Sequence, residues 1–411
     1  MKYLISKHKK KIKGEIVLPS SKSISNRLLM IRTLAKKSFE IYNLSYSDDT
    51  KNLVKILKSE SNVFDVGNAG TTMRFLTSYL ANKPGEWILT GSDRMKNRPI
   101  GILVNALNEL GVKIEYLEKE GFPPIKIHGT NLKGGNIEIS GSISSQFISS
   151  LLLIAPTLPN GLNIKLKSKI VSKPYIDMTL NLMRYFGIKS KWEENHIIIK
   201  KQNYKSKDYI VEADWSSASY WYEMAAIADY ADIKLYGLKK NSIQGDSIIS
   251  ELFEKIGIKT SFISGGVHLT KVGKPTIKQF EYDFSGNPDI TQTMAVTLSA
   301  LNIPFSLTGL ETLLLKETNR ILALKNELFK TGSNLLITND SISKFKNNII
   351  DTDCSKTWSF KSCGDHRMAL SLAPLAMINE ITIDDSTVVK KSYPGFWEDI
   401  QKIGFEIQEI K

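Results

Sequence analysis

The stretch PSSKSISNR, residues Pro19–Arg27, combines hydroxyl side chains and two cations with the start of an amphipathic helix. Ile24 and Leu28 recur at helical spacing, so the polar residues fall at the helix N-terminus. Unpaired backbone N–H groups there, together with Lys22 and Arg27, favour a bound anion. Taken alone, the stretch could equally be an ordinary serine-capped surface helix, but the rest of the chain repeats its pattern.

Five further helix starts of small or polar residues follow, each leading into an apolar helix face. They lie at Gly70–Thr72, Ser144–Gln146, Ser216–Ser217, Asp289–Thr291 and Asp365–Arg367. A short strand is expected after each of the six helices, at Phe39–Leu44, Trp87–Thr90, Ile164–Leu166, Ile233–Tyr236, Phe305–Thr308 and Ile381–Ile383. The pattern indicates an α/β protein built from one repeated unit.

Glycines mark the end of the second helix in five of these units. They are Gly111, Gly187, Gly257, Gly332 and Gly404, spaced 76, 70, 75 and 72 residues apart. Glycine is the usual C-terminal cap of a helix, because it adopts left-handed backbone angles without strain. The regular spacing predicts six copies of a β-α-β-α-β-β unit.

Two irregular units set the expected domain boundaries. The first unit is shortened, and the last ends after one strand, Phe405–Ile410. Tyr3–Ile5 and Glu15–Leu18 are expected to pair with strands that would otherwise be left at an edge. We therefore expect two three-repeat domains, residues 20–213 (with the shortened first repeat) and residues 1–19 with 214–411.

Composition restricts the class of partner. The 411 residues carry a formal net charge of +13, which favours anionic ligands: nucleic acid, membrane surface or small phosphorylated molecules. No apolar run is long enough for a membrane span and Met1–Ile5 lacks the apolar core of a signal peptide, so a cytoplasmic protein is expected. Two cysteines, Cys354 and Cys363, fit a reducing compartment, and the five scattered histidines predict no zinc site.

Arginines at the helix starts are the candidate anion-binding groups, because forked guanidinium groups suit phosphate and carboxylate. They are Arg27, Arg74, Arg94, Arg98, Arg320 and Arg367. The densest site is LKETNR, residues Leu315–Arg320, where Glu317 lies between two cations. Glu317 and Asp289 could divide acid and base duties, or each could simply cap a helix.

Seven motifs in this order resemble those of the enolpyruvyl transferase family, and in particular its branch that acts on shikimate 3-phosphate. They are Ser21–Arg27, Gly67–Arg74, Arg94–Gly101, Ser144–Phe147, Val171–Ile176, Lys316–Arg320 and Asp365–Ala369. The resemblance covers nearly the whole chain. It implies a two-domain inside-out α/β barrel that transfers the enolpyruvyl group of phosphoenolpyruvate to the 5-hydroxyl of shikimate 3-phosphate, by addition and elimination, in chorismate and aromatic amino-acid synthesis. No metal or organic cofactor is implied, and the enzyme is expected to be a monomer that binds neither nucleic acid nor membrane.

The resemblance also implies individual roles. Glu317 is the implied proton donor and Asp289 the acceptor, with Lys22 able to share either task. Shikimate 3-phosphate would be held by Lys22, Ser23, Arg27, Ser144, Ser145, Gln146, Ser172, Tyr175, Asp289, Thr312 and Lys316. Phosphoenolpyruvate would be held by Lys22, Gly70, Arg98, Gln146, Arg320, His366, Arg367 and Lys391, with Arg94 close by.

Two positions depart from the family's pattern, and the sequence leaves rival functions to compare with it. Asn319 stands where the family usually has an acid, and Thr312 where it often has an asparagine. Neither change removes a charge that the mechanism needs, so altered affinity is expected. The sister enzyme acting on UDP-N-acetylglucosamine usually has a cysteine in the loop corresponding to Gly91–Arg98, which has none here. A non-catalytic or RNA-phosphate-binding repeat protein would predict aromatics interleaved with lysines, which are not evident.

Overall fold

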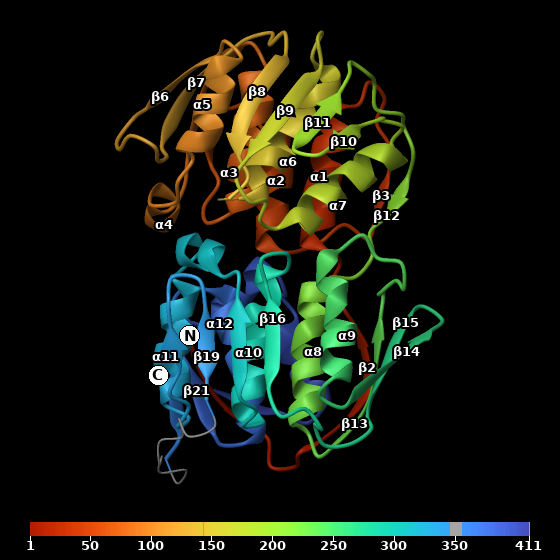
Figure 1. Cartoon of the computed structure of the whole chain (residues 1–411), viewed down its shortest axis with the longest axis vertical. Coiled ribbons are helices and arrows are strands. Elements are labelled where there is room, and N and C mark those ends of the chain that lie inside the picture. The colour runs from red at the N-terminus through yellow and green to blue at the C-terminus, as the bar shows by residue number, and fades with distance from the viewer. Residues whose placement is uncertain (143, 346–355, 411) are drawn as a thin grey trace. The chain divides into compact units, whose positions relative to one another are not determined.

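A computed structural model describes residues 1–142, 144–345 and 356–410, which fold into two compact units (Figure 1). Unit 1 comprises Met1–Ser21 and Glu212–Lys411, and unit 2 comprises Lys22–Val211. Helices and short strands alternate along both, as the sequence predicts for an α/β protein. Within the described residues, no helix is both long and apolar enough to cross a membrane. Cys363 is an exposed free thiol, whereas Cys354 lies outside the described residues.

Three buried helices form the centre of unit 1: α8 (Trp215–Ile227), α10 (Thr291–Ala300) and α12 (His366–Leu372). Nearly every residue of each is buried, as expected for helices surrounded by protein rather than facing solvent. Figure 1 shows α8 and α10 side by side, and Ser219 Oγ lies 2.9 Å from Thr293 Oγ1 between them. The outer helices are α9 (Ile249–Glu254), α11 (Arg320–Phe329) and α13 (Phe396–Lys402). Short 3-10 turns are η2 (Gly245–Ile248), η3 (Pro288–Ile290), η4 (Glu311–Leu315), η5 (Ala373–Met377) and η6 (Ser386–Lys391).

Three four-stranded sheets surround these helices in the described part of unit 1. Their strand orders are β14-β15-β13-β2, β16-β17-β19-β18 and β20-β21-β1-β22. The first comprises β2 (Lys11–Val17), β13 (Tyr230–Tyr236), β14 (Ile258–Ile263) and β15 (Gly266–Lys271). The second comprises β16 (Phe280–Asp283), β17 (Phe305–Thr308), β18 (Leu336–Ile337) and β19 (Ile342–Lys344). The third comprises β1 (Lys2–Ser6), β20 (Trp358–Phe360), β21 (Ile381–Ile383) and β22 (Glu406–Ile410). The N-terminal strands therefore complete two sheets: β1 lies between β21 and β22, and β2 pairs in parallel with β13.

Unit 2 has the same plan, with α1 (Lys22–Leu34), α3 (Gly70–Ala81) and α6 (Ser145–Ile154) at its centre. Ser78 Oγ donates to Ser150 Oγ at 2.8 Å, which joins α3 to α6. The other helices are α2 (Asp48–Leu57), α4 (Asp93–Lys96), α5 (Gly101–Glu109) and α7 (Lys173–Tyr185), with the 3-10 turn η1 (Ala155–Thr157). One sheet has the order β4-β5-β7-β6, with β4 (Val63–Asp65), β5 (Gly85–Thr90), β6 (Lys113–Tyr116) and β7 (Ile125–Gly129). The next has the order β10-β11-β9-β8, with β8 (Gly135–Ser140), β9 (Leu162–Lys167), β10 (Lys191–Glu193) and β11 (His196–Ile199).

The first repeat of unit 2 departs most from the repeated plan. Its sheet has two short strands, β3 (Ile41–Tyr42) and β12 (Tyr209–Ile210), paired in parallel. The strand expected over Phe39–Leu44 is thus shorter than predicted. Asn43 has a left-handed backbone (φ 58°), which ends the strand. Phe39 is buried, with its ring centroid 4.5 Å from that of Phe186, so its apolar character reflects core packing rather than pairing.

Glycine caps end the second helices, as the spacing predicts. Gly111, Gly187, Gly257, Gly332 and Gly404 all have φ between 82° and 95°. A side chain with a Cβ adopts these angles only with strain, so these positions require glycine to turn the chain from helix to strand.

Candidate active site

Arg320 organises a cluster of acidic side chains in unit 1. Its Nε and Nη2 donate to Asp365 at 2.7 and 3.2 Å, Nη2 donates to Glu317 Oε2 at 3.0 Å, and Nη1 donates to Asp289 Oδ1 at 3.3 Å. The Arg320 side chain is 1% exposed and that of Asp365 is fully buried. Burial opposes the guanidinium charge, yet Asp365, Glu317 and Asp289 hold the pKa of Arg320 above its ordinary value. One arginine therefore fixes the positions of three carboxylates.

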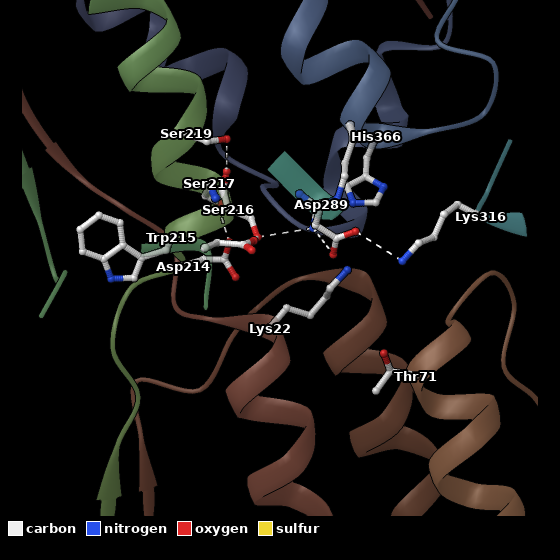
Figure 2. A network of polar contacts seen from close by, with 12 residues as sticks. Lys22, Thr71, Asp214, Trp215, Ser216, Ser217, Ser219, Asp289, Lys316 and His366 are labelled. Carbon is white, nitrogen blue, oxygen red and sulfur yellow. Dashed lines mark hydrogen bonds and ion pairs between the residues drawn. The ribbon is translucent and has the colours of Figure 1, made fainter. Parts of the chain in front are cut away.

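Asp289 is surrounded by cations. Arg367 Nη2 donates to its Oδ2 at 2.8 Å, and Lys316 Nζ donates to its Oδ1 at 3.5 Å (Figure 2). Although burial favours the neutral acid, Arg367, Lys316 and Arg320 together hold the pKa of Asp289 well below its usual range. The group is therefore a carboxylate at neutral pH, the form that can accept a proton. An anionic ligand that engages these cations would raise its basicity.

Glu317 has cations on both sides. Its Oε2 accepts from Arg320, and its Oε1 lies 3.6 Å from Lys391 Nζ, at the end of η6. Both cations stabilise the carboxylate in the unliganded cluster. Anions bound to Lys391 or Arg320 would weaken that stabilisation and favour a protonated Glu317.

Neither Asp289 nor Glu317 caps a helix, so the alternative interpretation of both as capping acids is wrong. Asp289 lies within η3, and α10 begins after Ile290 with no side-chain cap. Glu317 lies before α11, whose cap is Asn319, with Oδ1 accepting from Leu322 N at 3.1 Å. Asn319 thus performs a structural task at the position where an acid was expected.

Asp365 is the acid that does cap its helix. Its Oδ1 accepts from Arg367 N at 2.9 Å at the start of α12, while both of its oxygens accept from Arg320. His366 follows and is buried, with Nδ1 3.6 Å from Asp365 Oδ1. One buried carboxylate therefore caps α12 and holds the guanidinium of Arg320.

Thr312 stands apart from this cluster. It lies in η4 and is buried, and its hydroxyl makes no hydrogen bond to any described residue. The other residues predicted in unit 1, namely Asp289, Lys316, Glu317, Arg320, His366, Arg367 and Lys391, are brought together directly or through Asp365.

In unit 2, the start of α1 supplies two cations in different settings. Lys22 Nζ lies 3.2 Å from Asp49 Oδ2, in the first turn of α2. Arg27 points into the unit, where Nε donates to Thr179 Oγ1 at 2.7 Å and Nη2 donates to Tyr175 O at 3.2 Å. Burial lowers the pKa of Arg27 to about 10, which leaves it charged at neutral pH. It is the link between α1 and α7.

The starts of α3 and α6 are linked by amide and hydroxyl groups. Ser144 caps α6 by accepting from Gln146 N at 3.2 Å, and Gln146 Nε2 donates to Thr71 Oγ1 at 3.3 Å. Gly70 begins α3 beside the guanidinium of Arg98: a Cβ at Gly70 would lie 2.7 Å from Arg98 Nη1. The absence of a side chain at Gly70 therefore leaves the space that the Arg98 guanidinium occupies.

The remaining predicted residues of unit 2 lie near helix starts. Ser172 precedes α7 with a left-handed backbone (φ 54°), and its carbonyl accepts from Tyr175 N at 3.0 Å. Ser23 is within the first turn of α1, and its carbonyl accepts from Arg27 Nη1 at 2.9 Å. Ser145 is the first residue of α6.

Comparison with known proteins identifies the family. The family model described as EPSP synthase (3-phosphoshikimate 1-carboxyvinyltransferase) matches residues 6–60 and 55–400. The chain belongs to the EPSP synthase family. A 3-phosphoshikimate 1-carboxyvinyltransferase of Bacteroides fragilis (strain YCH46) is 46% identical over 410 residues, covering 99% of both chains. That of Colwellia psychrerythraea is 36% identical, covering 96% of this chain and 97% of the relative.

Solved EPSP synthases have the same fold. A structure from Acinetobacter baumannii superposes with a TM-score of 0.76 at 22% identity, covering 99% of this chain and all of the other. The α/β fold class and the family resemblance predicted from sequence are thus confirmed, as is the enzyme class. As an EPSP synthase, the protein transfers the enolpyruvyl group of phosphoenolpyruvate to shikimate 3-phosphate in aromatic amino-acid synthesis, and neither rival function is favoured.

Several polar residues of this EPSP synthase contact the candidate site residues, although their sequence pattern predicts no role for them. Asp365 was quoted only as part of a motif, although it holds Arg320. Asp49 pairs with Lys22, and Thr71 receives the Gln146 bond. Ser216 lies within hydrogen-bonding distance of Arg367, at 3.5 Å. Their one shared signal is position: each is within two residues of a helix start.

Proposed function

We propose that Glu317 protonates the methylene carbon of phosphoenolpyruvate while Asp289 accepts the proton of the attacking 5-hydroxyl group. The observation that carries this assignment is the attachment of both carboxylates to one buried guanidinium, that of Arg320. Addition forms a carbon–oxygen bond at C2 and a carbon–hydrogen bond at C3. Elimination then breaks the bond between C2 and the phosphate oxygen and returns a proton from C3 to Glu317, while the departing phosphate takes the proton that Asp289 had accepted. Positioned acids and bases supply typically 10²- to 10⁴-fold in rate.

The surrounding cations are proposed to hold the anionic parts of the substrates. Both substrates carry a phosphate and a carboxylate, and arginine and lysine are suited to such groups. In unit 1 we assign Lys316 and Thr312 to shikimate 3-phosphate, together with Asp289. We assign Arg320, His366, Arg367 and Lys391 to phosphoenolpyruvate. The support for these cations is their convergence on Asp289 and Glu317.

In unit 2 the assignments follow the helix starts, where backbone N–H groups favour anions. Shikimate 3-phosphate is assigned to Lys22, Ser23, Arg27, Ser144, Ser145, Gln146, Ser172 and Tyr175. Phosphoenolpyruvate is assigned to Gly70 and Arg98, with Lys22 and Gln146 shared and Arg94 close by. Lys22 can share either proton transfer.

The remaining sequence-based expectations are also carried forward as proposals. These are the two three-repeat domains with boundaries at 20–213 and 1–19 with 214–411, and a cytoplasmic monomer that binds neither nucleic acid nor membrane. The net charge of +13 is accounted for in this proposal by small anionic substrates. Sedimentation analysis with and without substrates tests the monomer.

The assignment of Asp289 is tested by Asp289→Asn in D2O. With both substrates present, the wild-type enzyme is expected to introduce deuterium at the methylene carbon of recovered phosphoenolpyruvate, because addition is reversible. Asp289→Asn should lower this exchange and phosphate release together, by about 100-fold, since addition needs the acceptor. Proton NMR and a phosphate-release assay measure the two rates.

Asp283→Asn is the matched control, because Asp283 is an exposed acid at the end of β16 in the same repeat. Its rates should stay within about twofold of wild type. Phosphate release at the wild-type rate in Asp289→Asn would remove Asp289 from the mechanism.

Gly70→Ala is expected to weaken the binding of phosphoenolpyruvate but not that of shikimate 3-phosphate. The new methyl group would lie 2.7 to 2.9 Å from three guanidinium atoms of Arg98, so Arg98 must move. A charge-assisted hydrogen bond contributes about 1.5–3 kcal/mol. The KM for phosphoenolpyruvate should therefore rise by about 10- to 100-fold, while that for shikimate 3-phosphate changes little.

The control for this change is Gly273→Ala, where a Cβ meets nothing within 4 Å and the backbone is unstrained. Steady-state kinetics with each substrate varied in turn give both constants. Equal rises in the two KM values in Gly70→Ala would contradict a local effect on Arg98.

A further inference from the structure

Asp246 is a buried acid that the assignments above leave without a task. It lies in η2 and is 3% exposed. Gln244 fastens this turn to the start of α8: its Nε2 donates to Ala213 O at 2.8 Å, and its Oε1 accepts from Trp215 N at 3.1 Å. The carboxylate is therefore held at a fixed place beside the first turn of α8.

A chain of hydrogen bonds leads from Asp246 to Asp289. Ser216 Oγ donates to Asp246 Oδ2, and the same Oγ accepts from Arg367 Nη2 at 3.5 Å. Arg367 Nη2 also donates to Asp289 Oδ2 at 2.8 Å. Figure 2 shows Ser216 in the first turn of α8, the green helix. Three hydrogen bonds, through two intervening residues, thus join Asp246 to the proposed proton acceptor.

The direction of the Ser216 proton makes this chain sensitive to the charge of Asp246. A hydroxyl group has one proton to donate. Ser216 donates it in a hydrogen bond to an ionised Asp246, which leaves an oxygen lone pair that can accept from Arg367. A protonated Asp246 instead donates to Ser216, whose own proton then has to turn elsewhere. Ser216 Oγ keeps a second lone pair for Arg367, but a neutral Asp246 no longer attracts the guanidinium electrostatically, so Arg367 is held less firmly.

We propose that Asp246 is a positioning residue for enolpyruvyl transfer, acting through Ser216 to hold the Arg367 guanidinium against Asp289. The proposal rests on the assignment of Arg367 to phosphoenolpyruvate and of Asp289 to the proton acceptor. It adds the residue that keeps the arginine in place. A displaced reacting group costs up to about 100-fold in rate.

Several charged groups decide in which pH range Asp246 is ionised. Burial and Asp289 raise the pKa of Asp246 to about 6, whereas Arg367 and the Ser216 bond oppose the rise. Asp214, before α8, adds to the rise. Asp246 is therefore largely ionised at pH 7 and above, and it is protonated as the pH falls through about 6. Positioning of Arg367 should be lost over the same range.

The experiment compares Asp246→Asn, Ser216→Ala and the double variant. Each single change is expected to lower kcat/KM for phosphoenolpyruvate by about 10- to 100-fold, as for other residues that orient a binding group. If Asp246 acts through Ser216, the kcat/KM of the double variant should be within about twofold of that of the less active single variant. The loss of activity below pH 6.5 in the wild-type enzyme should be reduced in Asp246→Asn. A purely structural acid would produce neither result.

Asp214→Asn is the matched control, because Asp214 lies equally close to α8 but caps it, with Oδ1 accepting from Ser217 N at 2.8 Å. Asparagine also caps helices well, so kcat/KM should stay within about twofold. Effects of Asp246→Asn and Ser216→Ala that multiply in the double variant would overturn the proposal. So would a wild-type kcat/KM in either single variant.

Arg367→Lys separates this proposal from the proposed function. A wild-type KM for phosphoenolpyruvate in Arg367→Lys would refute the assignment of Arg367 and with it both proposals. A raised KM in Arg367→Lys combined with unaffected Asp246→Asn would refute the positioning role alone. With both proposals correct, adding Asp246→Asn to Arg367→Lys should change kcat/KM by no more than about twofold.

Discussion

Glu317→Gln is expected to lower kcat by about 10²- to 10⁴-fold while both substrates still bind. Glutamine has the same shape as glutamate and keeps an oxygen that can accept from Arg320 Nη2, now 3.0 Å from Glu317 Oε2. The cluster around Arg320 should therefore keep its geometry. The N–H protons of an amide are far too weakly acidic to protonate the methylene carbon, so the proton transfer of the addition step is blocked. Phosphate release measures the rate, and calorimetric titration with each substrate measures binding.

Glu311→Gln provides the comparison, because Glu311 is a partly buried acid in η4 of the same repeat and, within the described residues, forms no hydrogen bond or ion pair with the cluster. Its kcat should stay within about twofold of wild type. Turnover at the wild-type rate in Glu317→Gln would show that another group donates the proton. Loss of substrate binding in Glu317→Gln would show instead that the carboxylate serves affinity.

Local signals account for most of the fold that could be predicted from the sequence. Glycines at near-constant spacing indicate the repeat because each must adopt a backbone that other residues avoid, and that requirement is independent of what surrounds it. The strand over Phe39–Leu44 was predicted too long for the opposite reason. Phe39 is apolar because it packs against Phe186, a contact between residues far apart in the chain.

In the candidate site too, local features could be predicted from the sequence, whereas contacts between distant residues could not. The motifs place acids and cations near helix starts, and that position can be recognised along the sequence. Which carboxylate meets which arginine depends on how α10, α11 and α12 pack, since Asp289, Arg320 and Asp365 are 31 and 45 residues apart. The capping interpretation of Asp289 and Glu317 was wrong because the caps of α10 and α11 lie one and two residues after these acids, at Ile290 and Asn319. Asp246 lay in a turn without helical periodicity, so no pattern marked it.

Arg320→Met is expected to lower the free energy of unfolding by about 3–5 kcal/mol, the usual result of removing one member of a buried ion cluster. The arginine is 1% exposed and donates to Asp365, which is fully buried. Methionine fills similar volume but leaves Asp365, Glu317 and Asp289 without their shared guanidinium. The loss therefore comes from uncompensated buried charge rather than from a cavity. Urea unfolding followed by tryptophan fluorescence measures the change.

Two further variants distinguish this cause from lost packing. Arg184→Met removes an exposed arginine, whose Nη1 donates to Asn181 Oδ1 at 3.1 Å, and should cost less than about 1 kcal/mol. Asp365→Asn in the Arg320→Met background removes the buried charge while keeping a helix cap, because asparagine also caps well. If unpaired charge is the cause, this double variant should be more stable than Arg320→Met alone. A double variant less stable than Arg320→Met would show that the unpaired charge of Asp365 is not the cause of the loss.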